Sequence, residues 1–466
     1  MADVPEYSIR FQHRALAELR TRLLADLTRE HWAVVLGSSS VVGSLVVIKA
    51  YEVVYPEPED YQQQSRTFLR LDKAFVHRTL SRLLSSGRMD TIIDVHTHPF
   101  SGTRVGFSAV DDADELTFAR FLRKKFDKLT YASIVLSQTQ YSARVWLSQG
   151  SEIELREASL RTQTMAESLP TSSGKRDGRG QTDGNGAKTL TDAIFQRPSL
   201  AIGVDTLRLI AAGQKVTIVG LGGLGSVIAE NLLHMGFHDF VLIDPDSLEV
   251  SNLSRVVGAY YEDAEAGVAK VDVIARHLRR INPKISVVPL EMEVQDSRAA
   301  EHIAGSNWLI VATDNHSSRK AVQLLSLEYF VPLISAGVNI SLEADQISDM
   351  SGEVITARVG DRLCLFCLGR INFAQVAAET HNDEFVRREL IRRGYVSGGD
   401  VQEPAVKTLN AIVASMAVDV LMNQYIGRTR HVPILVYENN ATACIYEDVG
   451  SLARRRGSCY SCFIGK

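Results

Sequence analysis

Apolar stretches of strand length alternate with stretches of helical periodicity along most of this chain. In the first third, strands are predicted at 32–37 (WAVVLG), 41–55, 91–96 (TIIDVH), 131–137 and 141–148. Helical spacing is found at 11–27, 69–86 and 115–126. Strands and helices that follow one another in this way predict an α/β domain.

The second half shows the same alternation with shorter apolar runs. Strands are predicted at 215–220 (KVTIVG), 239–246, 285–290, 307–313 (NWLIVAT) and 331–338. Helices are predicted at 226–236 and at 270–282, where Val271, Ile274, Ala275, Leu278 and Ile281 share one face. Strands that alternate with helices are typical of a doubly wound, mostly parallel sheet.

Between these two regions, residues 162–192 are rich in Gly, Ser, Thr and charge and nearly free of large apolar side chains. Such a segment cannot bury enough surface to offset its ordering entropy. A chain of 466 residues is also too long for one ordinary domain. We therefore expect a first domain at 1–161, a flexible linker at 162–192 and a second domain at 193–466.

Charge and composition exclude several function classes. The net charge of −4 gives no sign of a nucleic-acid or membrane-surface partner. The sequence has no signal-peptide core at its start and no apolar run of membrane-spanning length. We expect a cytoplasmic protein, in which cysteines stay reduced.

The segment DVHTHPFSGTRVGFSAVDD at 94–112 gathers metal-binding side chains. His96 and His98 alternate at the end of a predicted strand, so both rings can face one ion. Asp111 can supply a carboxylate ligand, and Asp112 is an alternative to it. Two histidines, a carboxylate and a water form a known catalytic zinc arrangement with one open position.

His96-Thr97-His98-Pro99 followed by Ser108-Ala109-Val110-Asp111 resembles the signature of the JAMM (JAB/MPN) metalloproteases. Glu30 precedes the run HWAVVLG, where that family carries a glutamate at the head of a strand, although Ala33 replaces a family glycine. The resemblance implies a cytidine-deaminase-like α/β domain. It implies Glu30 as general base, Ser108 as the oxyanion donor, and His96, His98 and Asp111 as ligands of a catalytic zinc.

A glycine-rich turn follows the strand KVTIVG and precedes a helix, as in nucleotide-binding sites. Gly220, Gly222, Gly223 and Gly225 would let the backbone approach phosphates closely. Asp244, about twenty residues after the turn, could bind a ribose. Taken alone, this pattern also fits a dinucleotide oxidoreductase.

The residues after the turn resemble the ThiF/MoeB adenylating family, which is related to ubiquitin activators. The resemblance rests on Asp244-Pro245-Asp246, on the segments at 251–255 and 267–270, and on Val311-Ala312-Thr313-Asp314-Asn315. It implies ATP and Mg²⁺ as cofactors and a homodimer. It assigns Asp244 to the ribose, Asp314 to Mg²⁺, Arg197 to the partner subunit's site, and Asn252, Arg255 and Lys270 to the phosphates. Taken singly, Lys270 could be a solvated charge, Arg255 a structural ion pair and Asp314 a helix cap.

Four of the five cysteines form two CxxC pairs, Cys364 with Cys367 and Cys459 with Cys462. In a reducing compartment this spacing predicts a closed, structural zinc site that joins the C-terminal tail to its domain. Cys444 is interpreted as a buried, inert thiol in a strand. The span after the first pair, where the family often places a thioester-forming cysteine, contains none.

The two resemblances together imply a bifunctional enzyme of a bacterial ubiquitin-like system. The second domain would adenylate the C-terminal carboxylate of a ubiquitin-like or sulfur-carrier protein, with a conjugating partner as a possible acceptor. The first domain would cleave that protein's precursor or its conjugates. A role in phage defence is implied by family analogy alone. An alternative is an adenylating enzyme of sulfur transfer or peptide biosynthesis whose JAMM-like domain binds without cleaving.

Overall fold

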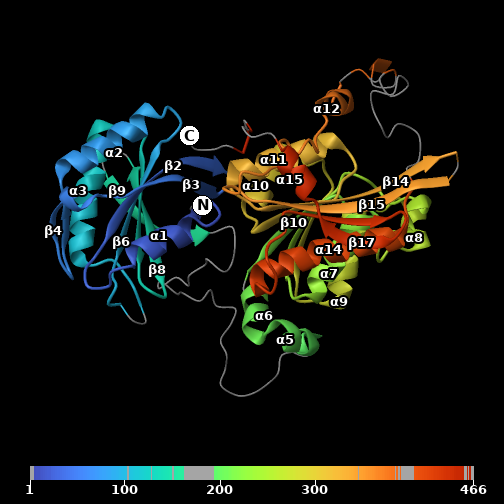
Figure 1. The fold of residues 1–466 in the computed structure, drawn as a ribbon, viewed down its shortest axis with the longest axis horizontal. Helices are drawn as coiled ribbons and strands as arrows, with labels where there is room; N and C mark the ends of the chain where they lie inside the picture. Colours follow the sequence, from blue (N-terminus) through green and yellow to red (C-terminus); the bar gives the residue numbers. More distant parts are fainter. Residues whose placement is uncertain are drawn as a thin grey trace. The chain divides into compact units, whose positions relative to one another are not determined.

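The computed structural model describes residues 5–462, apart from 102–103, 127, 150–151, 162–193, 212, 345, 382, 384, 387–388, 390–403, 456–458 and 460. The predicted linker at 162–192 therefore lies outside the described residues. The chain divides into two compact units, residues 1–186 (unit 1) and residues 187–463 (unit 2), whose elements are labelled in Figure 1.

Unit 1 is built around seven strands that close into a barrel in the order β1-β3-β2-β6-β7-β8-β9. Their bounds are β1 (Glu6–Phe11), β2 (Trp32–Val42), β3 (Leu45–Val54), β6 (Thr91–Thr97), β7 (Thr130–Leu136), β8 (Tyr141–Gln149) and β9 (Glu152–Arg161). A short 3₁₀ turn, η1 (Pro58–Asp60), leads into the two-stranded sheet of β4 (Tyr61–Gln64) and β5 (Leu69–Leu71).

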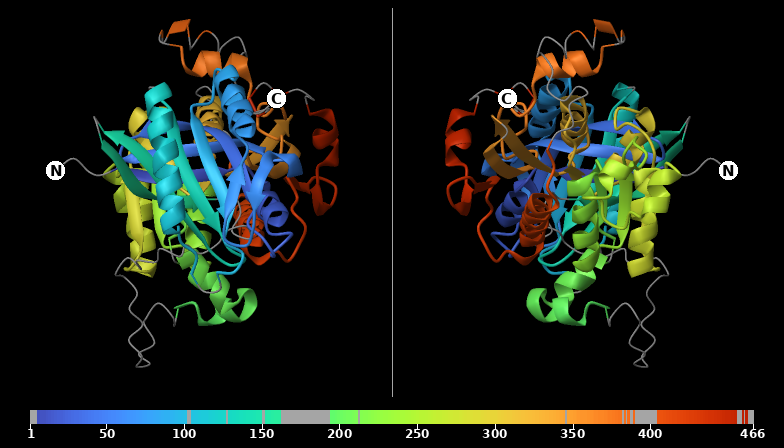
Figure 2. Two further views of the ribbon diagram at one scale, coloured as in Figure 1. Left: turned by 90° about the vertical axis from the view of Figure 1, so that its left-hand side faces the viewer. Right: turned by 90° about the vertical axis from the view of Figure 1, so that its right-hand side faces the viewer.

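The strand β2 shows why these sequences fold this way. Ala33 and Val35 belong to one apolar cluster with α1 (Ala15–Leu23), while Val34 and Leu36 belong to another with α2 (Lys73–Ser85) and α3 (Ala109–Lys125). Both faces of the strand are buried, and its sequence is therefore a continuous apolar run rather than an alternation. In the left view of Figure 2, α3 is the cyan helix in front of the strands of unit 1.

Unit 2 contains one eight-stranded sheet in the order β12-β11-β10-β13-β14-β15-β16-β17. The first five are parallel: β10 (Lys215–Val219), β11 (Asp239–Ile243), β12 (Ser286–Leu290), β13 (Trp308–Val311) and β14 (Leu333–Glu343). The other three are antiparallel: β15 (Gln346–Ala357), β16 (Ile434–Asn439) and β17 (Ala443–Glu447). The order reverses at β10, and such a switch point is where doubly wound sheets bind ligands.

Helices cover both faces of this sheet. Figure 1 shows α7 (Gly223–His234), α9 (Lys270–Ile281) and α14 (Lys407–Ile426) on one face, and α10 (Ser297–Ala304) and α11 (His316–Tyr329) on the other. The shorter helical elements are α5 (Gln196–Ile202), α6 (Val204–Ala211), η3 (Val250–Asn252), α8 (Tyr261–Glu265), α12 (Phe373–Glu379) and α15 (Val449–Arg454).

The helix α14 is long and apolar enough, by length and composition, to cross a membrane. However, 56% of its apolar window is buried within the structure. Its buried residues, among them Val413, Ala417 and Leu421, belong to the same apolar cluster as α7, α9 and the sheet. These contacts are those of a core helix.

The structure corrects several element predictions. Phe11 ends the strand β1, so the first helix does not begin until Ala15. Residues 69–71, expected to be helical, form β5, and a turn at Gly43 divides the predicted long strand into β2 and β3. Five further strands were not predicted, namely β1, β4, β9, β15 and β16, whereas β17 is the strand expected around Cys444.

Two glycines allow α7 to begin directly against the end of β10. Gly220 has a φ of 89°, a conformation that glycine adopts without strain. A Cβ on Gly225 would lie 1.8 Å from the carbonyl oxygen of Gly220, whereas a Cβ on Gly222 would meet nothing within 4 Å. Close packing of helix against strand therefore requires glycine at 225 and does not require it at 222.

We expect Gly225→Ala to destabilise unit 2 by roughly 1–3 kcal/mol, because the backbone must move to admit the methyl group. Gly222→Ala is the matched control and should leave the thermal unfolding of the full chain unchanged. Equal unfolding temperatures for the two variants would contradict this account of the turn.

Candidate functional sites

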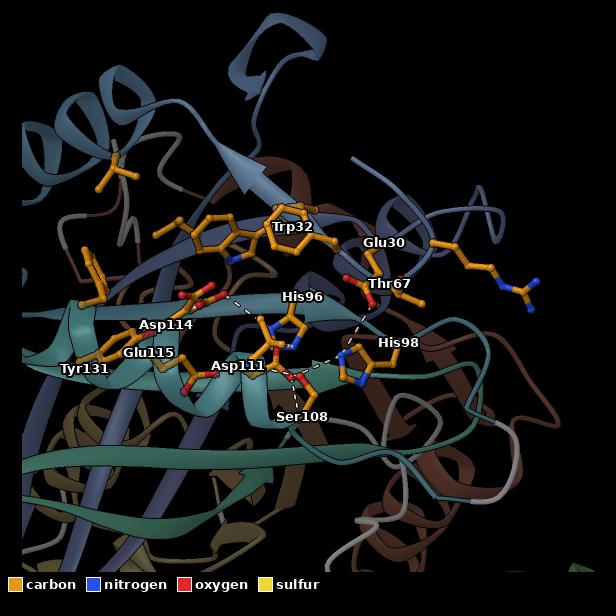
Figure 3. Close-up of a pocket in the computed structure, with 18 of the residues that line it drawn as sticks. Glu30, Trp32, Thr67, His96, His98, Ser108, Asp111, Asp114, Glu115 and Tyr131 are labelled. Carbon is orange, nitrogen blue, oxygen red and sulfur yellow. Dashed lines mark hydrogen bonds and ion pairs between the residues drawn. The ribbon is translucent and has the colours of Figure 1, made fainter. Parts of the chain in front are cut away.

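In unit 1, three predicted metal ligands lie together at the junction of β6 with α3. His96 is near the end of β6, His98 follows the strand, and Asp111 is in the first turn of α3. One Asp111 oxygen lies 3.6 Å from His96 Nε2 and the other lies 3.5 Å from His98 Nε2. Figure 3 shows the three side chains converging.

This geometry fits a zinc ion. Ligand atoms about 2.05 Å from a tetrahedral zinc are about 3.4 Å apart, close to the observed separations. The buried Nε2 of His96 has no hydrogen-bond partner among the described residues, as expected of an atom that faces a metal. Burial alone would lower the pKa of His96, but Asp111 and Asp94 outweigh it and raise that pKa to about 10. The surroundings therefore favour positive charge at this point.

Glu30 and Ser108, the predicted base and oxyanion donor, lie beside these ligands. Glu30 Oε1 is 3.9 Å from His98 Nε2. Burial, together with the charge of Asp111, raises the pKa of Glu30 to about 7 although His96 opposes the shift. Ser108 caps α3: its Oγ accepts from Asp111 N at 3.2 Å, and its own N–H donates to Asp111 Oδ2 at 2.6 Å. This capping box orients the Asp111 carboxylate.

The alternative ligand Asp112 points elsewhere. Its Oδ1 accepts from Arg144 Nη1 at 2.5 Å, and its side chain is 57% exposed. Asp111 is therefore the carboxylate at the histidines.

A cavity of about 440 Å³ extends from these residues. Its walls combine apolar side chains, including Trp32, Val34, Ile92 and Phe118, with acidic ones. Two of the acidic side chains, Asp94 and Glu115, were missed in the sequence. Asp94 Oδ1 is 3.9 Å from His96 Nδ1, and Asp94 Oδ2 accepts from Tyr131 at 3.3 Å. Asp94 could have been found, because a residue two positions before His96 in a strand points to the same side.

Glu115 could not have been found in this way, because its hydrogen-bond partners lie on strands that are far from it in the sequence. Its Oε2 accepts from Arg144 Nε at 2.9 Å, from Trp146 Nε1 at 2.7 Å and from Ser133. Burial and the charge of Asp94 raise the pKa of Glu115 to about 7, although Arg144 opposes the shift.

In unit 2, the glycine turn lies against the end of β13, beside the predicted Mg²⁺ ligand. A Cβ on Gly220 would lie 2.7 Å from the Thr313 methyl group, so Thr313 packs against the turn. Asp314 is the next residue in the chain. The helix α11 is capped by Asn315, whose Oδ1 accepts from Ser318 N at 2.8 Å. Asp314 is exposed and has no hydrogen bond or ion pair with the described part of the chain, which leaves its carboxylate free to bind a cation.

Asp244 lies beneath the turn at the end of β11. Its Oδ2 accepts from Leu221 N at 2.6 Å and its Oδ1 accepts from Asp246 N at 2.9 Å. Burial raises the pKa of Asp244, with Lys270 opposing the shift. In this structure the carboxylate stabilises the turn itself.

The predicted phosphate-binding residues approach the same turn to different degrees. Arg255 Cβ and Cδ lie 3.0 Å from the position of a Cβ on Gly223. Lys270 pairs with Asp246 at 2.7 Å, and Asn252 is buried and accepts from Glu249 N at 3.3 Å within its own turn. Arg197 is exposed on α5, and no side-chain hydrogen bond or ion pair joins it to another described residue.

The four paired cysteines meet in one buried cluster. Their sulfur atoms lie within 4.8 Å of one another, and Cys364 Sγ is 3.6 Å from Cys459 Sγ. The N–H of Cys364 donates to Cys367 Sγ at 3.2 Å, which helps to stabilise a thiolate. Four buried sulfurs with no other ligand type are suited to a closed tetrahedral zinc.

The interpretation of Cys444 was wrong in one respect. It does lie in a strand, β17, but the side chain is exposed. Among the described strands it is the last in the sheet, so only one of its edges is paired.

The fold and turn of unit 2 define a nucleotide-binding domain of the doubly wound class. Residues 197–459, more than half of the chain, match the ThiF family model, and the chain belongs to the ThiF family. The sheet of unit 2 is thus the Rossmann-type sheet of a ThiF domain.

Two curated relatives match part of this region. A molybdopterin-synthase adenylyltransferase of Salmonella typhimurium is 35% identical over 157 residues, which cover 34% of this chain and 59% of the relative. A SAMP-activating enzyme E1 of Haloferax volcanii is 33% identical over 124 residues, covering 27% and 45%. The chain therefore spans about half the length of these relatives.

A solved structure of Escherichia coli MccB with AMPCPP and MccA overlaps this chain with a TM-score of 0.46 and 17% identity. The overlap covers 60% of this chain and 75% of that one. This likeness is too low to support a functional inference.

We expect about two zinc ions per purified chain, one at each cluster of ligands. Cys462→Ser should remove one zinc and lower the unfolding temperature, because it opens the site that joins the two cysteine pairs. Elemental analysis and thermal unfolding check both effects. Cys444→Ser is the matched control, and loss of zinc from it would contradict the assignment.

Proposed function

We propose that unit 2 adenylates the C-terminal carboxylate of a ubiquitin-like or sulfur-carrier protein with ATP and Mg²⁺. The family match supports this proposal, and one observation carries it: the carboxylate of Asp314, which pairs with no described residue, lies next to the glycine turn at a helix end without a side-chain cap. The two relatives are named for adenylation and activation. An oxidoreductase would have no need of Asp314, Arg255 and Lys270 around the phosphates.

For this reaction the protein has mainly to position the reactants and to stabilise the developing charge. The substrate carboxylate oxygen forms a bond to the α-phosphorus, and the bond from that phosphorus to the bridging oxygen breaks, releasing pyrophosphate. Arg255 and Lys270 would offset the charge that develops on the phosphates. Lys270 must leave Asp246 to do so, since the two are paired at 2.7 Å in the free chain. Mg²⁺, when bound at Asp314, would supply further positive charge.

We further propose that unit 1 is a JAMM-like zinc peptidase that cleaves a peptide or isopeptide bond of the same protein. A zinc ion held by His96, His98 and Asp111 would lower the pKa of a bound water. Glu30 would accept a proton from that water and pass it to the leaving amine. Ser108 Oγ accepts from Asp111 N, and its O–H would turn to the oxyanion and donate to it.

The same proposal includes a cytoplasmic homodimer that hands the acyl-adenylate to a separate acceptor or conjugating partner. The alternative is an enzyme of sulfur transfer or peptide biosynthesis in which unit 1 binds without cleaving. The complete set of Glu30, Ser108 and three ligands around one point favours a peptidase over such a scaffold. Tail cleavage, assayed by mass spectrometry of the carrier protein, separates the two.

Asp314→Ala should lower ATP–pyrophosphate exchange by at least about a hundredfold, because it removes the cation ligand beside the phosphates. Peptidase activity should remain. Asp419→Ala, at an exposed carboxylate on α14, is the control and should retain exchange. Unchanged exchange in Asp314→Ala would refute the proposed role.

Glu30→Gln should lower peptide cleavage by at least about a hundredfold while zinc stays bound, because Glu30 is a base and not a ligand. Activity assays and elemental analysis are run on the same sample. Glu59→Gln, at an exposed site on η1, should behave as the parent. Zinc loss in Glu30→Gln would mean that Glu30 is itself a ligand.

A further inference from the structure

The N-terminal end of α7 is an uncapped helix end at the glycine turn. Gly222 at the cap position has no side chain, and no side-chain oxygen caps the helix. The cap bond runs from Ser226 N to Gly222 O. The first-turn N–H groups therefore have no side-chain acceptor in the described chain, and they favour an anion.

A second polar group faces this helix end from a distant part of the sequence. Asn410, in the first turn of α14, is 4% exposed. Its Nδ2 lies 2.4 Å from the position that a Cβ on Gly223 would occupy. The Asn410 carboxamide makes no side-chain hydrogen bond with any described residue. The amide N–H groups of Asn410 are therefore available to a bound acceptor.

The surroundings indicate the charge of that acceptor. Arg255 Cβ and Cδ lie 3.0 Å from the same position on Gly223, so the Arg255 side chain and the Asn410 amide flank the first residue of α7. Arg255 Nη1 donates to Ser251 O at 3.2 Å, and the other N–H groups of this guanidinium, the amide and the helix end together suit a phosphate. The lack of a side chain at Gly223 is what gives Asn410 room to reach the helix end.

We propose that Asn410 is a phosphate-binding residue of the nucleotide site, donating from Nδ2 to the phosphate chain that rests on α7. The proposal rests on the ATP-dependent function proposed for unit 2 and adds to it a ligand from the C-terminal helix. Gly223 then serves two purposes, a free N–H at the helix end and space for a second donor.

The test uses two substitutions in the full chain and compares ATP with adenosine as probes. Asn410→Ala removes the donor and should weaken ATP binding roughly tenfold, as expected for a hydrogen bond to a charged group. Asn410→Asp should weaken ATP binding further, because its carboxylate repels phosphate. Adenosine carries no phosphate, and both variants should bind it as the parent does.

Asn410→Asp also separates a phosphate contact from a structural defect. Its carboxylate can accept from the free N–H groups of α7, so the unliganded chain should unfold at the parent's temperature or above it. Lost ATP affinity without lost stability would support the proposal. Asn231→Asp is the matched control: it also lies at the contact of α7 with α14, eight residues or about 12 Å further along α7.

Three results would overturn the inference. Parent-like ATP affinity in both variants would show that Asn410 does not touch phosphate. A parallel loss of ATP and adenosine affinity with a lower unfolding temperature would show a structural role only. If the parent chain itself binds no ATP, the proposed function of unit 2 fails first and the inference falls with it.

Discussion

Helix ends have unpaired N–H groups, and both candidate sites lie where such an end meets the end of a strand. At α3 the end is closed by Ser108 and Asp111, which bond to each other's backbone. That closure orients the Asp111 carboxylate toward His96 and His98. At α7 no side chain closes the end, and the glycine turn leaves it open. The same physical requirement thus orients a metal ligand in one unit and leaves donors for an anion in the other.

Local sequence patterns predicted the parts of each site that come from one strand and its following turn. Alternation placed His96 beside His98, and the order of strand, glycines and helix predicted the turn at Gly220. Asp111 and Asp112 could not be separated from the sequence, because the choice depends on Arg144 in a distant strand. Glu115 and Asn410 were missed for the same reason: each acquires its role from residues far away in the chain.

The strands that were missed show a related limit. β9 (EIELREASLR) alternates charged with apolar residues weakly, and β15 carries most of its apolar residues at one end. Such sequences become strands because neighbouring strands offer backbone hydrogen bonds, which a single-strand pattern does not reveal. Cys444 is the converse case. Its alternation correctly predicts a strand, yet its position at the end of the sheet leaves it exposed.

Contacts from the C-terminal third distinguish the two helix ends beside the glycine turn. Glu379, on α12, accepts from His316 N at 3.0 Å and from Ser317 N at 2.6 Å, so a carboxylate already occupies the end of α11. At α7 the nearby side chain is that of Asn410, which is neutral and has N–H groups that can donate. Of these two ends, therefore, the one at α11 would repel an added anion and the one at α7 would attract it. Asp314 lies between Thr313, which touches Gly220, and the cap of α11. A phosphate chain drawn to α7 would then have Asp314 at its side, where a carboxylate can share a cation with it.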